Sequence, residues 1–292
     1  MVKIRVPATS ANMGPGFDCM GIALGLYCTV TFEEADDLVI TGCPSCYATE
    51  RNLCYLGYRE AMQKMGFVCE GVHLHIESEV PVARGLGSSA ALLTAGVFGA
   101  NALHGNRLSY PDMLAILNRL EGHPDNVAPA LYGGMTAGFV GEDGMPFVEP
   151  YAVSEKLHFT VVIPDFRVST REARKLLPKT VSLSDAVYNL SRSAVLCKAI
   201  ERGDTATIGM AMKDKLHQKY RRTLIPGYNE TEKAALQAGA CAFCISGSGS
   251  TMLAVSETEK TTEILQAYVS THFPDWTVKE LSPDPTGACV TE

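Results

Sequence analysis

The chain has 292 residues, 46% of them hydrophobic, and carries a formal net charge of −7. It is long enough to bury a substantial core in one large or two moderate domains. The acidic balance argues against broad binding of nucleic acid or of an anionic membrane, because both partners attract basic surfaces. Residues 1–7 lack the apolar core of a secretion signal, and no run approaches the ~18 apolar residues of a membrane span. We therefore expect a soluble cytoplasmic protein with neither a nucleic-acid nor a membrane partner.

Ten cysteines include two C-x-x-C pairs, Cys43 with Cys46 and Cys241 with Cys244. A zinc ribbon separates such pairs by about 15 to 20 residues, and here they lie at opposite ends of the chain. The second pair also falls in a predicted strand, where residues three apart point to opposite faces. The sequence therefore favours buried, reduced thiols and a reducing compartment over a zinc site.

A first strand is predicted up to Pro7, because apolar residues alternate with charged ones. The run 8–18 is rich in turn-forming residues but poor in charge, so we expect an ordered loop that presents Asn12 and Asp18. A tight connection made of Asx turns is the alternative. The next predicted elements are strands at Gly21–Tyr27, Thr29–Glu33 and Leu38–Thr41, and a helix at Tyr55–Met65 that ends at Gly66.

A glycine-rich turn joins a predicted strand at residues 72–77 to a predicted helix that begins at Ser88 or Ser89, where either hydroxyl would be a good N-cap. Backbone N–H groups and the positive end of the helix dipole face such a turn, while Gly85 and Gly87 leave room for a close approach. This combination is suited to binding phosphate. A plain turn leading into an Ala-rich core helix is the alternative.

Two common phosphate loops do not fit this turn. No lysine follows Gly87, as a Walker loop requires, and the third glycine of a dinucleotide fingerprint is missing. The run Gly-Leu-Gly-Ser-Ser-Ala-Ala instead resembles the phosphate loop of the GHMP kinase superfamily, a group of small-molecule kinases. By this resemblance the ATP-binding residues are Pro81, Val82, Ala83, Arg84, Gly85, Leu86, Gly87, Ser88, Ser89, Ala90 and Ala91.

A helix predicted from Ser109 through Leu120 places Glu121 at the end of an apolar stripe. A glutamate at a helix end is usually solvated. The alternative is that Glu121 is partly buried and compensated by Mg²⁺, which prefers oxygen ligands. Polar residues crowd into the segment that follows, Gly-His-Pro-Asp-Asn, before an apolar stretch. A core has no reason to contain them, so they are site candidates: His123, Asp125 and Asn126.

The hydrophobic pattern weakens between residues 138 and 156 into Gly, Pro and acidic residues, so we expect an inter-domain connection there. Capping-box spacing at 169–172 then predicts a helix with Arg171 and Arg174 on one face, and Arg221 follows further on. The other predicted elements are a strand at Phe159–Ile163, helices at Ser184–Arg202, Thr205–Leu216 and Glu230–Ala238, a strand at Ala240–Ile245, a glycine turn at Ser246–Thr251, a strand at Met252–Val255, a helix at Thr262–His272 and a strand at Thr277–Leu281. The tail after Pro283 carries no signal.

Three separated motifs resemble one family of GHMP kinases, the homoserine kinases. They are Pro-Ala-Thr-Ser-Ala-Asn-Met-Gly-Pro-Gly-Phe-Asp, the phosphate loop, and Glu-Gly-His-Pro-Asp-Asn-Val-Ala-Pro. Met13 replaces a leucine and Lys219 a proline of the family pattern. Composition and spacing alone predict a two-domain mixed α and β protein. The resemblance implies an α+β, two-domain GHMP kinase fold: an N-terminal ATP-binding domain at 1–150, ribosomal protein S5 domain 2-like, and a ferredoxin-like C-terminal domain at 151–292.

The resemblance also implies a reaction, transfer of the γ-phosphoryl group of ATP to the hydroxyl of L-homoserine. By motif match, Asp18 would bind the substrate ammonium, Arg174 and Arg221 its carboxylate, and Asn12 and His123 would orient the amine or hydroxyl end. These residue types suit a zwitterion, which needs one anionic partner and cationic forks.

For catalysis the resemblance implies Mg²⁺ held by Ser88 and Glu121. Asp125 is the obvious base from the sequence, whereas the family picture needs no strong base and makes Asn126 a positioning group. A homodimer is suggested by family likeness alone. The alternatives are another GHMP kinase that acts on a different small alcohol, and an inactive nucleotide-binding relative.

Overall fold

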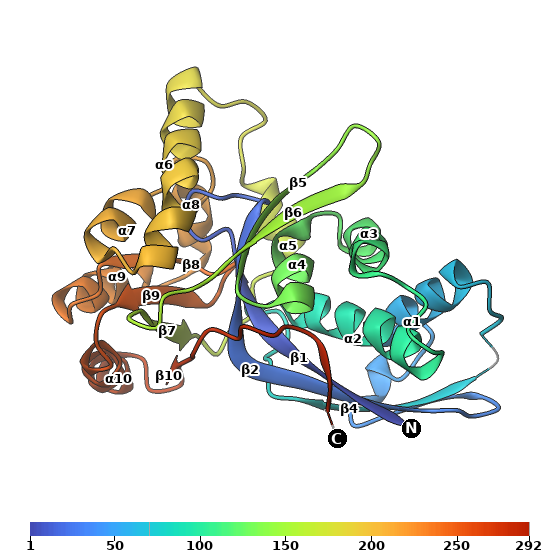
Figure 1. Ribbon diagram of the computed structural model, residues 1–292. Coiled ribbons are helices and arrows are strands. Elements are labelled where there is room, and N and C mark those ends of the chain that lie inside the picture. The colour runs from blue at the N-terminus through green and yellow to red at the C-terminus, as the bar shows by residue number, and fades with distance from the viewer. Residues whose placement is uncertain (70, 292) are drawn as a thin grey trace.

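Two long antiparallel strands, β1 (Val2–Ala11) and β2 (Met20–Glu33), lie at the centre of the first sheet (Figure 1). The computed structural model describes residues 1–69 and 71–291. The predicted end of β1 at Pro7 is wrong, because the strand passes Pro7 with a register shift between Pro7 and Ala8. A bulge tolerates a residue that has no N–H to donate. The two strands predicted at 21–27 and 29–33 are one continuous strand.

The first sheet has the order β11-β1-β2-β4-β3, and β5 pairs with both β2 and β6. The connection predicted at 138–156 is largely a hairpin, in which Phe139 and Phe147 face each other with ring centroids 5.4 Å apart. The tail also contains a strand, because residues 289–291 pair with β1. The bounds are β3 (Leu38–Thr41), β4 (Val72–Ser78), β5 (Met135–Val140), β6 (Pro146–Tyr151) and β11 (Cys289–Thr291).

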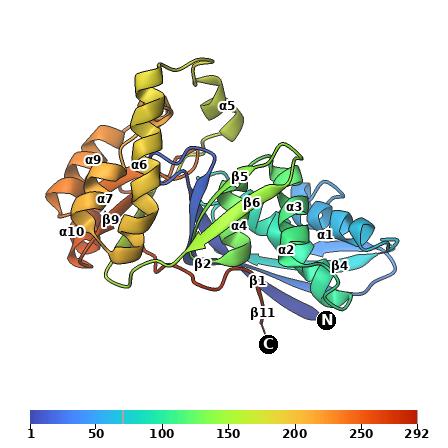
Figure 2. The same cartoon turned by 45° about the horizontal axis from the view of Figure 1, so that its top comes forward.

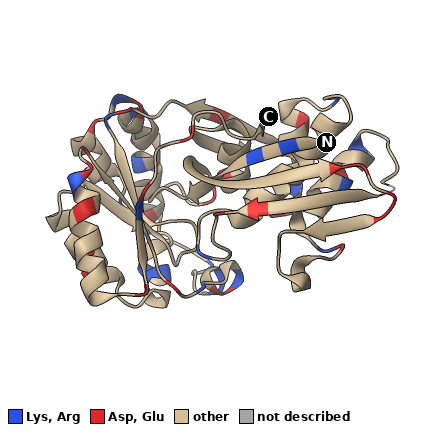
Figure 3. Ribbon diagram, turned by 90° about the horizontal axis from the view of Figure 1, so that it is seen from below, with Lys and Arg blue, Asp and Glu red and all other residues tan. Residues whose placement is uncertain are grey.

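Helices cover one face of this sheet (Figure 2). On the opposite face, the side chains of Lys3 and Arg5 on β1 and of His75 on β4 are at least partly exposed. This face is turned toward the viewer in Figure 3. The helices at residues 53–64 and 88–103 pack closely on each other, since a Cβ at Gly57 of the first would lie 2.5 Å from the Leu93 carbonyl oxygen of the second. The bounds are η1 (Ser45–Tyr47), α1 (Leu53–Lys64), α2 (Ser88–Leu103), α3 (Tyr110–Glu121) and α4 (Pro124–Tyr132).

The second sheet has the order β10-β7-β9-β8 and carries helices on both faces. One face shares a continuous core with α6, α7 and the first sheet, and the other packs on α9 and α10. The strands are β7 (His158–Ile163), β8 (Ala242–Ile245), β9 (Met252–Ser256) and β10 (Thr277–Glu280). The helices are α5 (Thr170–Lys175), α6 (Leu183–Arg202), α7 (Thr205–Ala211), α8 (Gln218–Arg221), η2 (Arg222–Leu224), α9 (Tyr228–Gln237) and α10 (Lys260–His272).

Three local predictions about helix ends are wrong. The N-cap of α2 is Gly87, with φ +67° and no side-chain hydrogen bond, so neither serine hydroxyl caps this helix. Ser169 precedes α5 without forming the predicted capping box. The helix predicted through Leu216 ends at Ala211, because the carboxylate of Asp214 accepts backbone N–H groups just before α8.

All ten cysteines are free. Four are buried, but Cys46 is exposed and five others are partly exposed, so burial of the thiols is wrong as a general prediction. Burial raises the pKa of Cys244 to about 12, as expected for an inert thiol. Within residues 1–69 and 71–291, no helix is long and apolar enough to span a bilayer.

Candidate active site

The phosphate loop, residues 81–91, packs between β1 and the turn at residues 246–251. Gly87 has φ +67°, and a Cβ there would overlap the hydroxyl of Thr9. Gly85 has φ +81°, and a Cβ there would overlap the carbonyl oxygen of Ser246. Both positions therefore need glycine for two reasons, the left-handed backbone and the close approach.

The turn between β8 and β9 packs directly against this loop. The hydroxyl of Ser246 donates to the Gly85 carbonyl at 2.6 Å, and the Thr251 amide donates to the Arg84 carbonyl at 2.9 Å. The amide of Gly247 reaches β1, where it donates to the Ala11 carbonyl at 3.1 Å. The two sheets thus meet at the loop, and their junction forms one wall of a cavity.

That cavity has a volume of about 460 Å³, within the range of small-molecule sites. Most of the residues singled out from the sequence line it, although they come from five separate segments: Asn12, Asp18, Val82, Ala83, Gly85, Gly87, Ser88, Ser89, Glu121, His123, Asp125, Asn126, Arg174 and Arg221. The fold therefore brings all three motifs to one place.

Five residues of the predicted ATP-binding run do not line the cavity. The side chains of Leu86, Ala90 and Ala91 are buried in the core below the loop. Arg84 points to the other sheet, where its Nη1 donates to the Pro164 carbonyl. Pro81 lies at the start of the turn. These residues can support the loop but offer no side chain to a ligand in the cavity.

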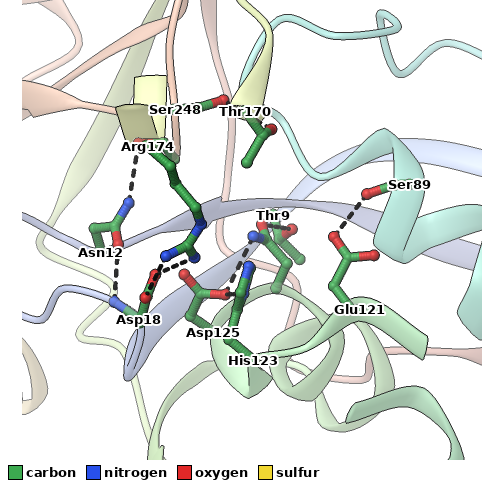
Figure 4. Close-up of polar contacts among 12 residues, drawn as sticks. Thr9, Asn12, Asp18, Ser89, Glu121, His123, Asp125, Thr170, Arg174 and Ser248 are labelled. Atoms are coloured by element: carbon green, nitrogen blue, oxygen red, sulfur yellow. Dashed lines mark hydrogen bonds and ion pairs between the residues drawn. The ribbon is translucent and has the colours of Figure 1, made fainter. Parts of the chain in front are cut away.

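Asp18 and Arg174 form a bidentate ion pair across the two halves of the chain (Figure 4). Both N–O distances are 2.8 Å, which is the geometry of a strong guanidinium–carboxylate pair. The hydrogen bonds from Arg174 to Asp18 raise the pKa of the guanidinium. Asp18 has φ +59°, and its amide donates to Asn12 Oδ1 at 3.0 Å, so the N-terminal loop fixes the carboxylate.

Arg221 is only 2% exposed and lies at the base of the same cavity. Its Nη1 donates to the Gly247 carbonyl at 2.9 Å, and Asn12 donates to the same oxygen at 2.9 Å. The guanidinium lies 5.0 Å from the ring centroid of Phe17. Burial lowers the pKa of Arg221, and within the described chain its Nε has no partner. A buried, incompletely paired cation favours an anionic ligand.

Glu121 and Ser89 face each other at the opposite side of the cavity (Figure 4). The hydroxyl of Ser89 donates to Glu121 Oε1 at 2.7 Å, whereas Ser88, the predicted partner, lines the cavity beside them. Burial raises the pKa of Glu121, because desolvation penalises its charge. A half-buried carboxylate beside hydroxyl oxygens is a donor set that suits Mg²⁺.

His123 and Asp125 are paired at the start of α4, where His123 is the N-cap. Burial lowers the pKa of His123, but the hydrogen bond and the charge of Asp125 outweigh it and the net direction is upward. Asp125 is 2% exposed. Asn126 follows it and accepts a hydrogen bond from the Thr9 hydroxyl at 2.8 Å.

One further group of candidate metal ligands lies in the cavity. Oxygen or nitrogen atoms of Asp18, His123 and Asp125 fall within 4.8 Å of one another. The Asp18 carboxylate is already engaged by both Nη atoms of Arg174, so a cation there would compete with a guanidinium. Glu121 has no such competitor among its hydrogen bonds and remains the better candidate.

Sequence reasoning missed part of the site. The wall beyond the phosphate loop comes from η1 and the start of α1, together with Leu92 of α2: Cys46, Tyr47, Thr49, Arg51, Asn52 and Leu53. Its only local signal is Asn52, whose side chain caps α1 by accepting from the Cys54 amide at 2.9 Å. A cap predicts where a helix begins and not which cavity the preceding loop lines.

Comparisons with known proteins agree with this geometry. Residues 52–134 match the model of the GHMP kinases N terminal domain, and residues 196–275 match that of GHMP kinases C terminal. A homoserine kinase of Clostridium beijerinckii is 40% identical over 100% of this chain and 99% of its own.

Two solved structures resemble the fold. The crystal structure of homoserine kinase from Cytophaga hutchinsonii has a TM-score of 0.87 and 31% identity, and covers 99% of this chain and 97% of its own. Mevalonate kinase of L. major, with a TM-score of 0.74 and 15% identity over 98% of this chain and 96% of its own, shows the shared fold alone. This chain therefore belongs to the GHMP kinases and, among them, to the homoserine kinase family.

Proposed function

We propose that this protein transfers the γ-phosphoryl group of ATP to the side-chain hydroxyl of L-homoserine and forms O-phospho-L-homoserine, a step of threonine biosynthesis. The observation that carries the proposal is the likeness, over the whole chain, to a homoserine kinase at 40% identity. The cavity supports it, because a main-chain loop of the phosphate-binding kind lies next to opposite charges that suit an amino acid.

The amino-acid end contains the ion pair of Asp18 with Arg174. We assign Asp18 to the ammonium of homoserine, and Arg174 and Arg221 to its carboxylate. A zwitterion can enter by replacing one internal ion pair with two external ones, so neither side chain loses a partner. A neutral alcohol would leave the internal pair closed, and an amine without a carboxylate would leave Arg174 unpaired. The pair thereby supports selection for a substrate that carries both charges.

The phosphate end lacks a charged side chain from the loop itself, since Arg84 points away. We assign the triphosphate to the backbone amides of residues 85–90 and the positive end of α2. Mg²⁺ would be held by Glu121 and Ser88, with Ser89 donating to Glu121 from the other side. When bound, this cation neutralises charge on the phosphate oxygens.

The homoserine hydroxyl needs orientation more than a strong base, because phosphoryl transfer passes through a loose transition state. We assign this positioning to Asn126 and Asn12. Thr9 donates to Asn126 Oδ1, so the amide side chain of Asn126 has a fixed orientation and its Nδ2 can face Asp125 at 3.4 Å. Asp125 then acts as a positioning group, because it is hydrogen-bonded to His123 and supplies a negative charge beside that ring.

We propose two domains, 1–150 and 151–292, with β11 returning to the first sheet at the end of the second domain. The free thiols and the need for ATP fit a cytoplasmic enzyme.

We further propose a homodimer that uses the outer face of α6. Leu183, Val187 and Leu190 recur there at intervals of four and three residues and are 80%, 53% and 71% exposed. This spacing matches a helix–helix seam. The stripe is uncharged, and the nearby carboxylate of Asp185 is compensated by Lys215 at 3.5 Å, so a second copy of the same helix fits without repulsion. In analytical ultracentrifugation, Leu190→Asp should give monomers.

The exposed Ile264 of α10 provides the matched control for this surface. Ile264→Asp should leave the dimer intact. A wild-type monomer at micromolar concentration, or equal effects of the two substitutions, would exclude the α6 interface.

The kinase proposal is tested with purified protein, ATP and Mg²⁺ in an assay of ADP release. L-Homoserine should stimulate release, whereas D-galactose and mevalonate should not, because neither carries the two charges. Release with either of those alcohols and none with homoserine would identify another GHMP kinase. No release with any alcohol, while ATP still binds in calorimetry, would identify an inactive nucleotide-binding relative.

A further inference from the structure

Two histidines lie side by side on one face of the first sheet, away from the cavity. His73 and His75 are two residues apart on β4, so they project to the same side, while Val72, Leu74 and Ile76 face the core. The active-site cavity does not include either histidine.

Both imidazoles point at one hydroxyl group. The Nε2 atom of His73 lies 3.1 Å from Thr41 Oγ1, and the Nδ1 atom of His75 lies 2.9 Å from the same oxygen. Thr41 is the direct neighbour of His75 in the pairing of β3 with β4. The register of the strands therefore places both ring nitrogens within 3.1 Å of one oxygen atom.

Glu33 fixes the orientation of one ring. Its Oε2 lies 3.2 Å from Nδ1 of His73, and the two residues are cross-strand partners in the pairing of β2 with β4. A carboxylate at Nδ1 keeps the proton on that nitrogen, so Nε2 presents its lone pair toward Thr41. Metal-binding histidines commonly have this carboxylate on their other nitrogen.

The Thr41 hydroxyl carries one proton, so it can donate to one of the two ring nitrogens, while the other ring can donate its own N–H to the same oxygen. The two neutral tautomers of an imidazole differ only in which nitrogen carries the proton, so both nitrogens that face Thr41 can present lone pairs to a divalent cation. The connection from β2 to β3 adds negative charge close to Glu33, since it carries Glu34, Asp36 and Asp37.

From this geometry we propose a surface site for a divalent transition-metal ion, such as Ni²⁺, Zn²⁺ or Cu²⁺, with His73 Nε2 and His75 Nδ1 as ligands. Imidazole suits these metals, whereas Mg²⁺ prefers oxygen. Water fills the remaining coordination positions, because the sheet face is open. Glu33 acts through His73 as a positioning residue.

Isothermal titration of the untagged full chain with NiCl₂ tests this site, with excess Mg²⁺ present to occupy oxygen-rich sites. We expect one Ni²⁺ per chain for the wild type, no saturable binding for His75→Gln, and about 10-fold weaker binding for Glu33→Gln. His272→Gln is the matched control, because His272 is an exposed histidine on α10 outside this cluster. It should bind like the wild type.

A second measurement keeps the test independent of calorimetric background. The electron paramagnetic resonance spectrum of one equivalent of Cu²⁺ should show two coordinated nitrogens, and His75→Gln should lose this two-nitrogen signal. Equal binding by wild type and His75→Gln, or the absence of saturable binding in the wild type, would overturn the proposal. ADP release should be unchanged in all these variants, so the result is separate from the proposed kinase activity.

Discussion

The two ends of the cavity offer different chemical groups, main-chain amides at one end and charged side chains at the other. At the phosphate end the loop offers main-chain amides, and Gly85 and Gly87 are held by neighbouring backbone and hydroxyl groups. At the amino-acid end the contacts are charged side chains, and Asp18 and Arg174 neutralise each other. The first end is therefore complete before a ligand arrives, whereas the second must exchange partners. Substitutions should disturb the first end through shape and the second through charge.

The largest effect is expected from Gly87→Ala. A Cβ at this position overlaps the Thr9 hydroxyl, so either the loop moves or the hydroxyl turns away and loses its hydrogen bond to Asn126, and φ +67° adds backbone strain. Displacement by about 1 Å costs on the order of 100-fold, and loss of one oriented donor costs a similar factor. We therefore expect kcat/KM to fall by at least about 1,000-fold in the ADP-release assay.

Gly105→Ala separates this overlap from backbone strain. Gly105 has φ +87°, and a Cβ there meets nothing within 4 Å. The Gly105→Ala substitution should cost only about 1 kcal/mol of folding stability and leave KM for ATP unchanged. If Gly87→Ala and Gly105→Ala have similar activity, the close packing of the phosphate loop is not required for the reaction.

The next effect is expected at the charged end, from Arg221→Ala. Removing a buried charged partner of a ligand typically costs about 2 to 5 kcal/mol. We expect KM for homoserine to rise on the order of 100-fold while the Kd of ATP stays within about 2-fold, because Arg221 is assigned to the proposed carboxylate end and not to the phosphate loop. Initial rates over a homoserine series, with ATP binding measured by calorimetry, check both parts.

The neighbouring Arg222 is exposed and supplies the control. Arg222→Ala should leave both constants unchanged. An unchanged KM in Arg221→Ala would remove Arg221 from the amino-acid site, and a loss of ATP binding would show that the two ends are not independent.

The chemistry of the charged end is tested by Asp125→Asn. If Asp125 positions His123, the loss of its charge should lower kcat by about 10-fold, because phosphoryl transfer depends mainly on positioning and charge neutralisation. A fall of several orders of magnitude in a folded variant would instead identify Asp125 as a general base. Circular dichroism establishes folding, and single-turnover rates isolate the chemical step.

The comparison also explains what the sequence could predict. The geometry of the glycine loop was predictable because it is local: a glycine turn before a helix fixes amide directions within a few residues, and α2 begins at Ser88 as expected. The motif match also named Asp18, Arg174 and Arg221. The pairing of Asp18 with Arg174 was not predicted, since it depends on how α5 sits against the N-terminal loop.

Hydrogen-bond partners and strand partners that lie far apart in the sequence were not predicted, for the same reason. The hydrogen bond from Ser89 to Glu121 was not predicted, because it joins the start of α2 to the end of α3, 32 residues further along the chain. β11 was missed because three residues with little periodicity pair only once β1 offers a free edge. Both cases are tertiary effects with no local pattern.

The smallest expected effect concerns His217, which lies beneath the charged end. Its ring stacks on Phe17 at 5.1 Å between centroids, and Phe17 in turn lies under Arg174 and Arg221. Burial lowers the pKa of His217, against an opposing effect of the Asp214 charge. The folded protein therefore binds this proton less readily than the unfolded chain does. Stability is fully present above the ordinary histidine pKa of about 6.5 and is lost as pH falls toward the lowered value.

Comparison of pH 7.5 with pH 5.5 tests this linkage. Urea unfolding should show a larger loss of stability for the wild type than for His217→Gln, while the exposed-histidine variant His272→Gln should behave like the wild type. Charging the buried His217 also disturbs the Phe17 ring on which it stacks, and Phe17 lies under Arg174 and Arg221, so KM for homoserine should rise at low pH by a few-fold more than KM for ATP. If both KM values rise equally, and equally in His217→Gln, proton uptake by His217 does not act on the charged end, and the two ends respond to acid as one unit.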